Sequence, residues 1–198
     1  DGWLDEIRFG STFAAVTPTI ATVVTNTDDI AVNGDWRNDE RSGYTIIFTG
    51  TIGGTGAFVT ANGMTNVLIG TIAPGFGAGM LTIYQADGVV RLGAPDDALT
   101  LEIEDGDLLV LSNCTDAVSL GDAMVSFLNT STEGATNWFL YSTSGIQGSF
   151  AGVTFAQGSQ GQVIYDPANN RAGVCISTVQ PRVVVSTNAL AIAEGRTA

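Results

Sequence analysis

The sequence predicts an all-β fold, and three observations support this prediction. Short runs rich in Val, Ile, Thr and aromatic residues recur along the 198 residues. Gly, Asn, Asp or Pro separates most of these runs from the next one. No window keeps a 3.6-residue apolar period over three helical turns, and the nearest, Gly121–Asn129, is rich in residues that favour strands.

In Ala98–Glu104, three aliphatic residues alternate with polar ones, so one face of a strand is apolar and the other is charged. The predicted strands, in chain order, are Thr19–Thr25, Tyr44–Gly50, Gly56–Thr60, Asn66–Ile72, Met80–Gln85, Val89–Leu92, Ala98–Glu104, Leu108–Ser112, Ala123–Leu128, Asn137–Ser142, Gln162–Tyr165, Ala172–Thr178 and Arg182–Ser186.

Two all-β architectures suit such strands. In Tyr44–Gly56 and Asn66–Gly75, similar short strands recur, each followed by a glycine corner. This pattern is typical of a β-solenoid, whose successive turns stack their strands about 4.8 Å apart. It is equally typical of a β-sandwich or jelly roll. The segment Gly70–Ile83, GTIAPGFGAGMLTI, is too rich in Gly and Pro for a helix, and it predicts a corner at Pro74 between two strands.

The charge balance restricts the partners. Twenty acidic residues oppose seven basic ones, and the formal net charge is −13. Nucleic acids and anionic membranes attract positive charge, so neither is an expected partner. No run approaches the roughly 20 apolar residues of a membrane helix. The first residues, DGWLDEIRFG, do not resemble a signal peptide, so we expect a processed product or a part of something longer.

The order of several segments carries a family resemblance. GTIAPGFGAGMLTI is followed by VVRLGAPDDALTLEIEDGDLLVL, AVSLGDAMVSFLN, NWFLYSTSGIQGSFAGV and GQVIYDPANNRAGVCI. This succession, from about Gly50 to Ile176, resembles the passengers of autotransporter-like proteins and PEP-CTERM-type secreted surface proteins. The chain departs from that pattern at Phe76-Gly77-Ala78, where members of the family carry Ser-Pro.

The resemblance implies the C-terminal part of a right-handed parallel β-helix with capping strands. It also implies secretion, an extended structural or adhesive role, and no catalytic residues. It therefore favours the parallel β-helix over the sandwich or jelly roll, with residues 19–180 as the main domain.

The two ends, residues 1–18 and 181–198, are expected to stand apart from this domain. Trp3–Pro18 resembles the final strand of a concanavalin-A-like sandwich, and Arg182–Ala198 resembles the first strand of a Calx-β or Ig-like module. They are pieces of neighbouring domains, edge strands of the main domain, or donor strands that complete a sheet in another copy. Donor strands at both ends would join copies head to tail into a filament.

Catalysis is not expected. Glycoside hydrolysis needs two carboxylates about 5 to 9.5 Å apart, and the candidate pairs are Glu102 with Glu104 and Asp96 with Asp97. Alternating carboxylates on the outward face of a strand are ordinarily a solvated surface. Lys and His are absent from the chain, and nothing in the sequence indicates a cleft, so we predict that the protein is not an enzyme.

Calcium is the one cofactor for which the sequence offers ligands. Asp96 with Asp97, and Asp105 with Asp107, place paired carboxylates on predicted loops. No EF-hand or RTX repeat accompanies them, and the alternative is that these aspartates form turns. With no His and two Cys, a zinc site is not expected.

Five further side chains are candidates for binding or modification. Trp36, in the predicted polar loop NGDWRNDER, is the candidate carbohydrate contact. Asn113 and Asn129 begin the glycosylation sequons NCT and NTS. Cys114 and Cys175 form a disulfide in an oxidising compartment or remain two buried thiols.

These observations together predict a non-enzymatic structural or adhesive protein at the cell surface. Its partners would be further copies of itself, joined head to tail by strand exchange, or the neighbouring domains of a longer chain. The alternative is a carbohydrate-binding or carbohydrate-cleaving module of a large secreted protein.

Overall fold

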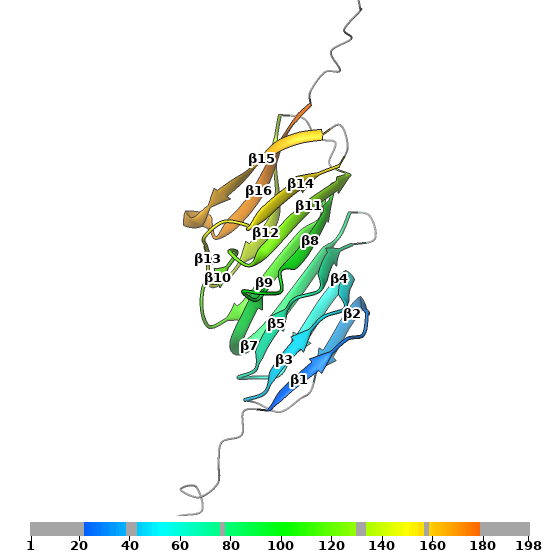
Figure 1. Ribbon diagram of the computed structural model, residues 1–198, viewed down its shortest axis with the longest axis vertical. Coiled ribbons are helices and arrows are strands. Elements are labelled where there is room, and N and C mark those ends of the chain that lie inside the picture. Colours follow the sequence, from blue (N-terminus) through cyan, green and yellow to red (C-terminus); the bar gives the residue numbers. More distant parts are fainter. Residues whose placement is uncertain (1–21, 39–42, 76–77, 130–133, 157–158, 179–198) are drawn as a thin grey trace, which may run out of the picture.

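A computed structural model describes residues 22–38, 43–75, 78–129, 134–156 and 159–178. The described part consists almost entirely of strands, β1 to β16, with one short 3-10 helix, η1 (Pro167–Asn169). The chain winds through about five turns of a β-solenoid, and successive turns pair in parallel (Figure 1). The predicted all-β class and parallel β-helix are confirmed. The sandwich or jelly-roll alternative is wrong, because those folds are built from antiparallel strands.

Each turn contributes to three walls, called walls A, B and C here. Wall A contains β1 (Val23–Asn26), β3 (Thr45–Phe48), β5 (Thr65–Leu68), the end of β7 (Met80–Leu92) and, lying against β7, β10 (Val118–Ser119) with its partner β13 (Ile146–Gln147). Wall B contains the starts of β2 (Ile30–Asn38) and β4 (Thr51–Thr60), then β6 (Thr71–Pro74), β8 (Leu99–Glu104), β11 (Ala123–Asn129) and β14 (Gly152–Phe155). Wall C contains the ends of β2 and β4, the start of β7, β9 (Leu108–Cys114) and β12 (Thr136–Ser142).

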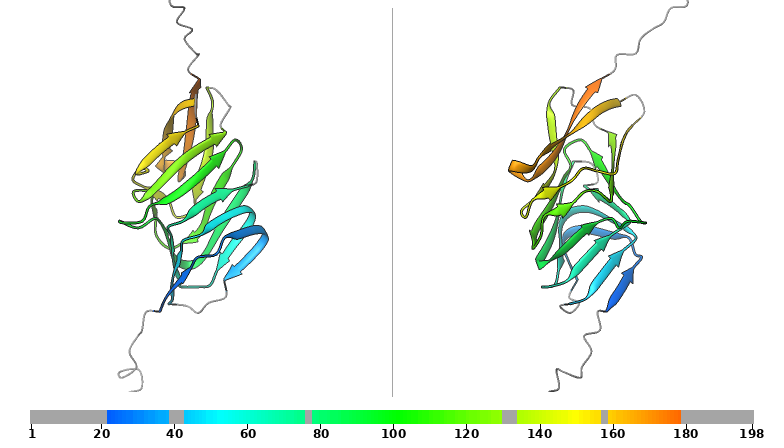
Figure 2. Two further views of the ribbon diagram at one scale, coloured as in Figure 1. Left: turned by 45° about the vertical axis from the view of Figure 1, so that its right-hand side comes forward. Right: turned by 60° about the vertical axis from the view of Figure 1, so that its left-hand side comes forward.

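The last two strands reverse this pattern. β16 (Arg171–Thr178) pairs antiparallel with β12, and β15 (Ser159–Asp166) pairs antiparallel with β16. This hairpin agrees with the capping strands that the family resemblance implies. β1 and β16 lie at opposite ends of the long axis of the molecule (Figures 1 and 2).

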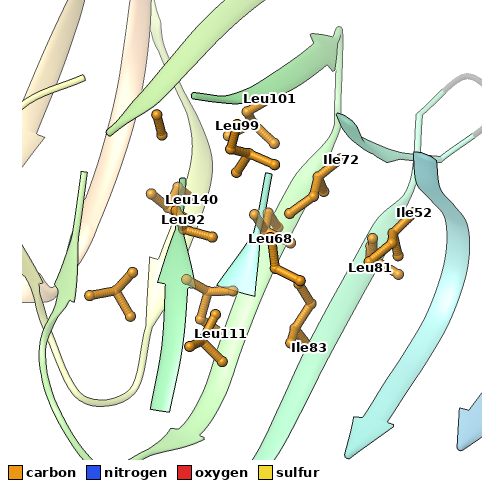
Figure 3. Close-up of a cluster of buried hydrophobic side chains, with 14 of the residues drawn as sticks. Ile52, Leu68, Ile72, Leu81, Ile83, Leu92, Leu99, Leu101, Leu111 and Leu140 are labelled. Atoms are coloured by element: carbon orange, nitrogen blue, oxygen red, sulfur yellow. The ribbon is translucent and has the colours of Figure 1, made fainter. Parts of the chain in front are cut away.

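Strand alternation places the core between the walls. On wall B, Ile52, Ile72 and Leu101 are in register in consecutive turns, and each is at most 2% exposed. Fully burying such a side chain contributes about 1.5 to 3 kcal/mol to folding. Figure 3 shows the side chains that meet in the interior: Leu68 and Leu92 from wall A; Ile52, Ile72, Leu99 and Leu101 from wall B; Leu81, Ile83, Leu111 and Leu140 from wall C.

Glycines form the corners that the sequence predicted. β6 ends at Pro74, and Gly75 follows with a φ of +80°, a conformation that glycine adopts without strain. The Gly75 N–H donates to the Gly54 carbonyl at 2.9 Å in the turn below. At the corner between walls A and B, Gly50 and Gly70 stack so closely that a Cβ on Gly70 would overlap the Gly50 carbonyl oxygen.

Some predicted boundaries differ from the observed ones. β2 runs through NGDWRN, which the sequence predicted as part of a polar loop, because β4 pairs with it along its whole length. β7 is one bent strand where two were predicted, with a shift in register between Tyr84 and Gly88. The terminal segments 1–18 and 181–198, including the predicted strand Arg182–Ser186, lie outside the described residues.

Candidate functional site

The four candidate calcium ligands lie in two turns. Asp96 and Asp97 are exposed in the turn between β7 and β8, where the backbone of Asp97 bonds to that of Ala94. Asp105 follows β8 and accepts a hydrogen bond from the Asn137 side chain at 3.3 Å. In the described part of the chain, no three or more His, Cys, Asp or Glu side chains are grouped so that they could hold a metal ion.

Asp107 is turned inward, towards the backbone. Its side chain is 2% exposed and accepts from the N–H of Gly79 at 3.1 Å and the N–H of Glu104 at 2.8 Å. Burial raises the pKa of Asp107; the two N–H bonds lower it, and the nearby Glu104 carboxylate raises it. In this geometry Asp107 ties the loop between β8 and β9 to Gly79 in the preceding turn of the solenoid. This is the role that the sequence offered as the alternative to calcium binding, in which the aspartates form turns.

The candidate modification sites are separate from one another. Cys114 is buried at the end of β9, Cys175 is half-buried in β16, and both thiols are free. Asn113 is exposed with a φ of +61°, and its side chain donates to the Tyr84 hydroxyl at 2.8 Å. Asn129 is the last residue of β11, and its sequon continues into residues outside the described part.

Trp36 lies on a strand with its ring packed against the core. The ring stacks on Phe58, with centroids 4.5 Å apart and planes 8° apart, and meets the edge of Phe48. Trp36 is half-buried and belongs to the first turn. The predicted solvent-exposed loop position is therefore wrong, because pairing with β4 turns this side chain inward.

A buried polar cluster was not predicted from the sequence. The Gln85 side-chain oxygen accepts from the Thr60 hydroxyl at 2.6 Å and from the Asn66 amide, and the Gln85 amide donates to the Ala61 carbonyl at 3.2 Å. Thr60, Asn66 and Gln85 are each at most 2% exposed. Alternation in Met80–Gln85 was a usable signal, because Leu81, Ile83 and Gln85 share the inward face.

The candidate functional site is the outer edge of the first turn, formed by β1 and the start of β2. Among the described residues, β1 pairs only with β3, and β2 pairs only with β4. Val24 is in register with Ile46, which is 2% exposed, yet Val24 itself is 37% exposed. An inward-facing position at the end of the stack is thus uncovered by any described turn.

The backbone of β1 presents hydrogen-bonding groups at this edge. The Thr49 N–H donates to the Asn26 carbonyl at 2.9 Å, so Asn26 faces β3. In a parallel ladder, alternate residues direct both backbone groups to the same neighbour. Val24 therefore also faces β3, whereas Val23 and Thr25 direct their N–H and C=O groups to the open edge.

The last turn has a similar edge on wall B. β14 pairs only with β11 among the described strands, and Val153 of β14 is 39% exposed although its register partner Val125 is 1% exposed. Beside it, the capping hairpin is held by Arg171, which lies 3.8 Å over the Trp138 ring and 2.9 Å from Asp166. Hydrogen bonds from Asn169 and Arg171 lower the pKa of Asp166. At this end β16 covers wall C, whereas no strand of the described ranges covers wall B.

Comparison of the chain with protein-family models, curated proteins and solved structures finds no match. The resemblance to autotransporter-like passengers therefore stays a prediction from the sequence. No helix among the described residues has the length and apolar character needed to cross a membrane.

Proposed function

We propose that this chain is a non-enzymatic, extracellular structural protein whose copies join end to end by backbone pairing, as subunits of a surface layer or filament. The observation that carries the proposal is the pair of strand edges at opposite ends of the β-helix that no described strand covers. Each edge belongs to a parallel ladder, and each exposes an inward-facing valine, Val24 at the first turn and Val153 at the last.

The two edges differ, so the contact between copies is head to tail. In the next copy, the start of β2 would pair with the β14 edge and extend wall B, while β1 would pair with the β13 edge and extend wall A. A contact between two different surfaces propagates into an open filament unless its rotation closes a ring. Main-chain hydrogen bonds provide most of the affinity in this mode of strand addition.

The charges of the first turn affect this contact. Arg37 and Asp35 on β2 form an exposed ion pair of 3.1 Å, and charges on an edge strand limit which strands pair with it. The net charge of −13 makes copies repel one another at long range. Because salt screens that repulsion, association is expected to strengthen with ionic strength.

The extracellular location rests on the sequence resemblance. If the chain is part of a longer protein, the same strand edges would pair with a neighbouring domain. An adhesive role is compatible with it, since an assembled β-helix presents its outward side chains in repeated rows. The proposal includes no catalytic step. Glu102, one of the candidate catalytic carboxylates, lies on the outward side of β8 between two buried neighbours.

Replacing Thr25 by Pro tests the proposal. Proline removes the Thr25 N–H, which points to the open edge, and leaves the bonds of Val24 and Asn26 to β3 in place; edge strands tolerate proline. Light scattering after size-exclusion chromatography is expected to show oligomers that grow with the concentration of the unmodified protein. Thr25→Pro weakens association by at least about tenfold, or about 1.4 kcal/mol, and the control Thr25→Val, which keeps the N–H, does not.

The proposal is wrong if the unmodified protein stays monomeric over the whole concentration range at high salt. It is also wrong if Thr25→Pro and Thr25→Val assemble equally well, since backbone pairing at β1 would then contribute nothing.

A further inference from the structure

Wall A carries a hollow of about 390 Å³ on its outer side, between the end of β7 and β10. Val67 and Val89, outward-facing residues of β5 and β7, form its apolar floor, and Pro95 forms part of one side. Sites for small ligands usually have volumes from about 300 to 1,000 Å³. The hollow is therefore large enough for a sugar ring.

The shape of the hollow follows from one long turn. The chain from Ile72 to its register partner Leu101 is longer than the preceding turn from Ile52 to Ile72, and part of the extra length is a tight loop after β7. Backbone bonds between Ala94 and Asp97 close this loop. At its base, a Cβ on Gly93 would overlap the Asp122 carbonyl oxygen. The loop is thus fixed against the next turn and forms a defined side of the hollow.

Arg91 gives the hollow its hydrogen-bond donors. It lies beside Val67 in the ladder, is exposed, and forms no ion pair with any described residue. Arg37 and Arg171, in contrast, are paired with Asp35 and Asp166. A guanidinium carries five donors in a planar fork, so Arg91 presents unused donors directly to the hollow.

Asp116 and Asp122 also line the hollow and provide acceptors. A carboxylate accepts through both oxygens, and a guanidinium donates through two parallel N–H groups, so each group matches two adjacent hydroxyls. The hollow thus combines paired donors, paired acceptors and an apolar floor within one small volume.

We infer that this hollow is a binding site for a neutral saccharide, a function separate from end-to-end assembly. Hydroxyl groups on a pyranose ring would bond to Arg91, Asp116 and Asp122, which all line the hollow. The C–H face of the ring would lie on Val67 and Val89. An anionic sugar is disfavoured because two carboxylates oppose one guanidinium in a chain of net charge −13. A bare cation would leave Arg91 and the apolar floor unused.

The test is a titration of the isotopically labelled chain, followed by nuclear magnetic resonance, with cellotetraose, laminaritetraose and mannotetraose. An oligogalacturonate serves as the anionic probe and Ca²⁺ alone as the cationic probe. At least one neutral oligosaccharide is expected to shift the backbone amides of Arg91, Ala94 and Ala117 saturably. Arg91→Gln lowers its affinity at least tenfold, whereas the matched control Arg37→Gln, which changes an arginine outside the hollow, leaves it unchanged.

Three results would overturn the inference. In the first, no neutral oligosaccharide changes the chemical shifts of those amides at concentrations up to about 10 mM, which detects dissociation constants in the millimolar range. In the second, Arg91→Gln and Arg37→Gln bind the sugar equally well. In the third, the acidic oligomer or Ca²⁺ binds there more tightly than every neutral sugar. Equal melting temperatures of the two variants confirm that any difference in binding is not caused by unfolding.

Discussion

Asp107 shows at the scale of one residue how a carboxylate that resembles a metal ligand serves the fold. Its two oxygens accept from two backbone N–H groups, one at Glu104, the last residue of β8, and one at Gly79 in the preceding turn of the solenoid. Asp96, on an exposed turn, bonds to neither. The two aspartates are therefore expected to respond differently to removal of the carboxylate.

Asp107→Ala is expected to lower the free energy of unfolding by about 1 to 3 kcal/mol, because it leaves two partly buried N–H groups unsatisfied. Asp96→Ala is the control and should change stability by less than about 0.5 kcal/mol. Urea denaturation measures both. Equal effects of the two substitutions would contradict the structural role of Asp107.

The same residue makes a prediction about pH. Because burial raises its pKa, the native state binds the Asp107 proton more tightly than the unfolded chain does. The contribution of this group to the free energy of unfolding therefore rises as the pH falls through the raised pKa. The difference in stability between the unmodified protein and Asp107→Ala should widen between about pH 7 and about pH 4. A difference that narrows over this range would contradict the raised pKa.

At the scale of the element, the corners between strands decide whether turns stack. Gly50 and Gly70 allow the backbones of consecutive turns to approach more closely than any Cβ permits. Gly121, at the start of the β11 turn, has only the Ser119 hydroxyl near its would-be Cβ, at 3.8 Å. Gly70 therefore lies at a close backbone contact, and Gly121 does not.

Gly70→Ala is expected to destabilise the protein by about 2 to 4 kcal/mol, because the carbonyl of Gly50 must move and the ladder with it. Gly121→Ala should be neutral within about 0.5 kcal/mol. Thermal unfolding of the two variants gives the comparison. If Gly70→Ala has the same melting temperature as the unmodified protein, the turns do not stack as described.

Strand positions in the middle of the chain could be predicted from the sequence, since alternation such as that of Leu99, Leu101 and Ile103 directly reports an inward face. The inward direction of Trp36 could not be predicted so easily. NGDWRNDER has the composition of a loop, and it forms a strand because β4 lies beside it. Local composition does not report which partner a segment finds elsewhere in the chain.

At the scale of the whole molecule, the parallel β-helix could be predicted, but the register of its turns could not. Turns of unequal length separate Ile52, Ile72 and Leu101, so no fixed repeat marks the register partners. For the same reason the hollow beside Arg91 was not predicted, because its lining residues come from four turns. The open edges also required the structure, since an exposed Val24 and a buried Ile46 occupy equivalent positions in similar strands.

The proposed assembly concerns the backbone groups of β1, and they can be observed directly. Hydrogen exchange of the Val23 amide, which points to the open edge, is the most direct measurement, with the Ile72 amide in the interior ladder as the reference. The Val23 amide should become increasingly protected as protein concentration rises, while that of Ile72 is protected throughout. If the Val23 amide exchanges rapidly and at the same rate at every concentration, copies of this protein do not join through β1.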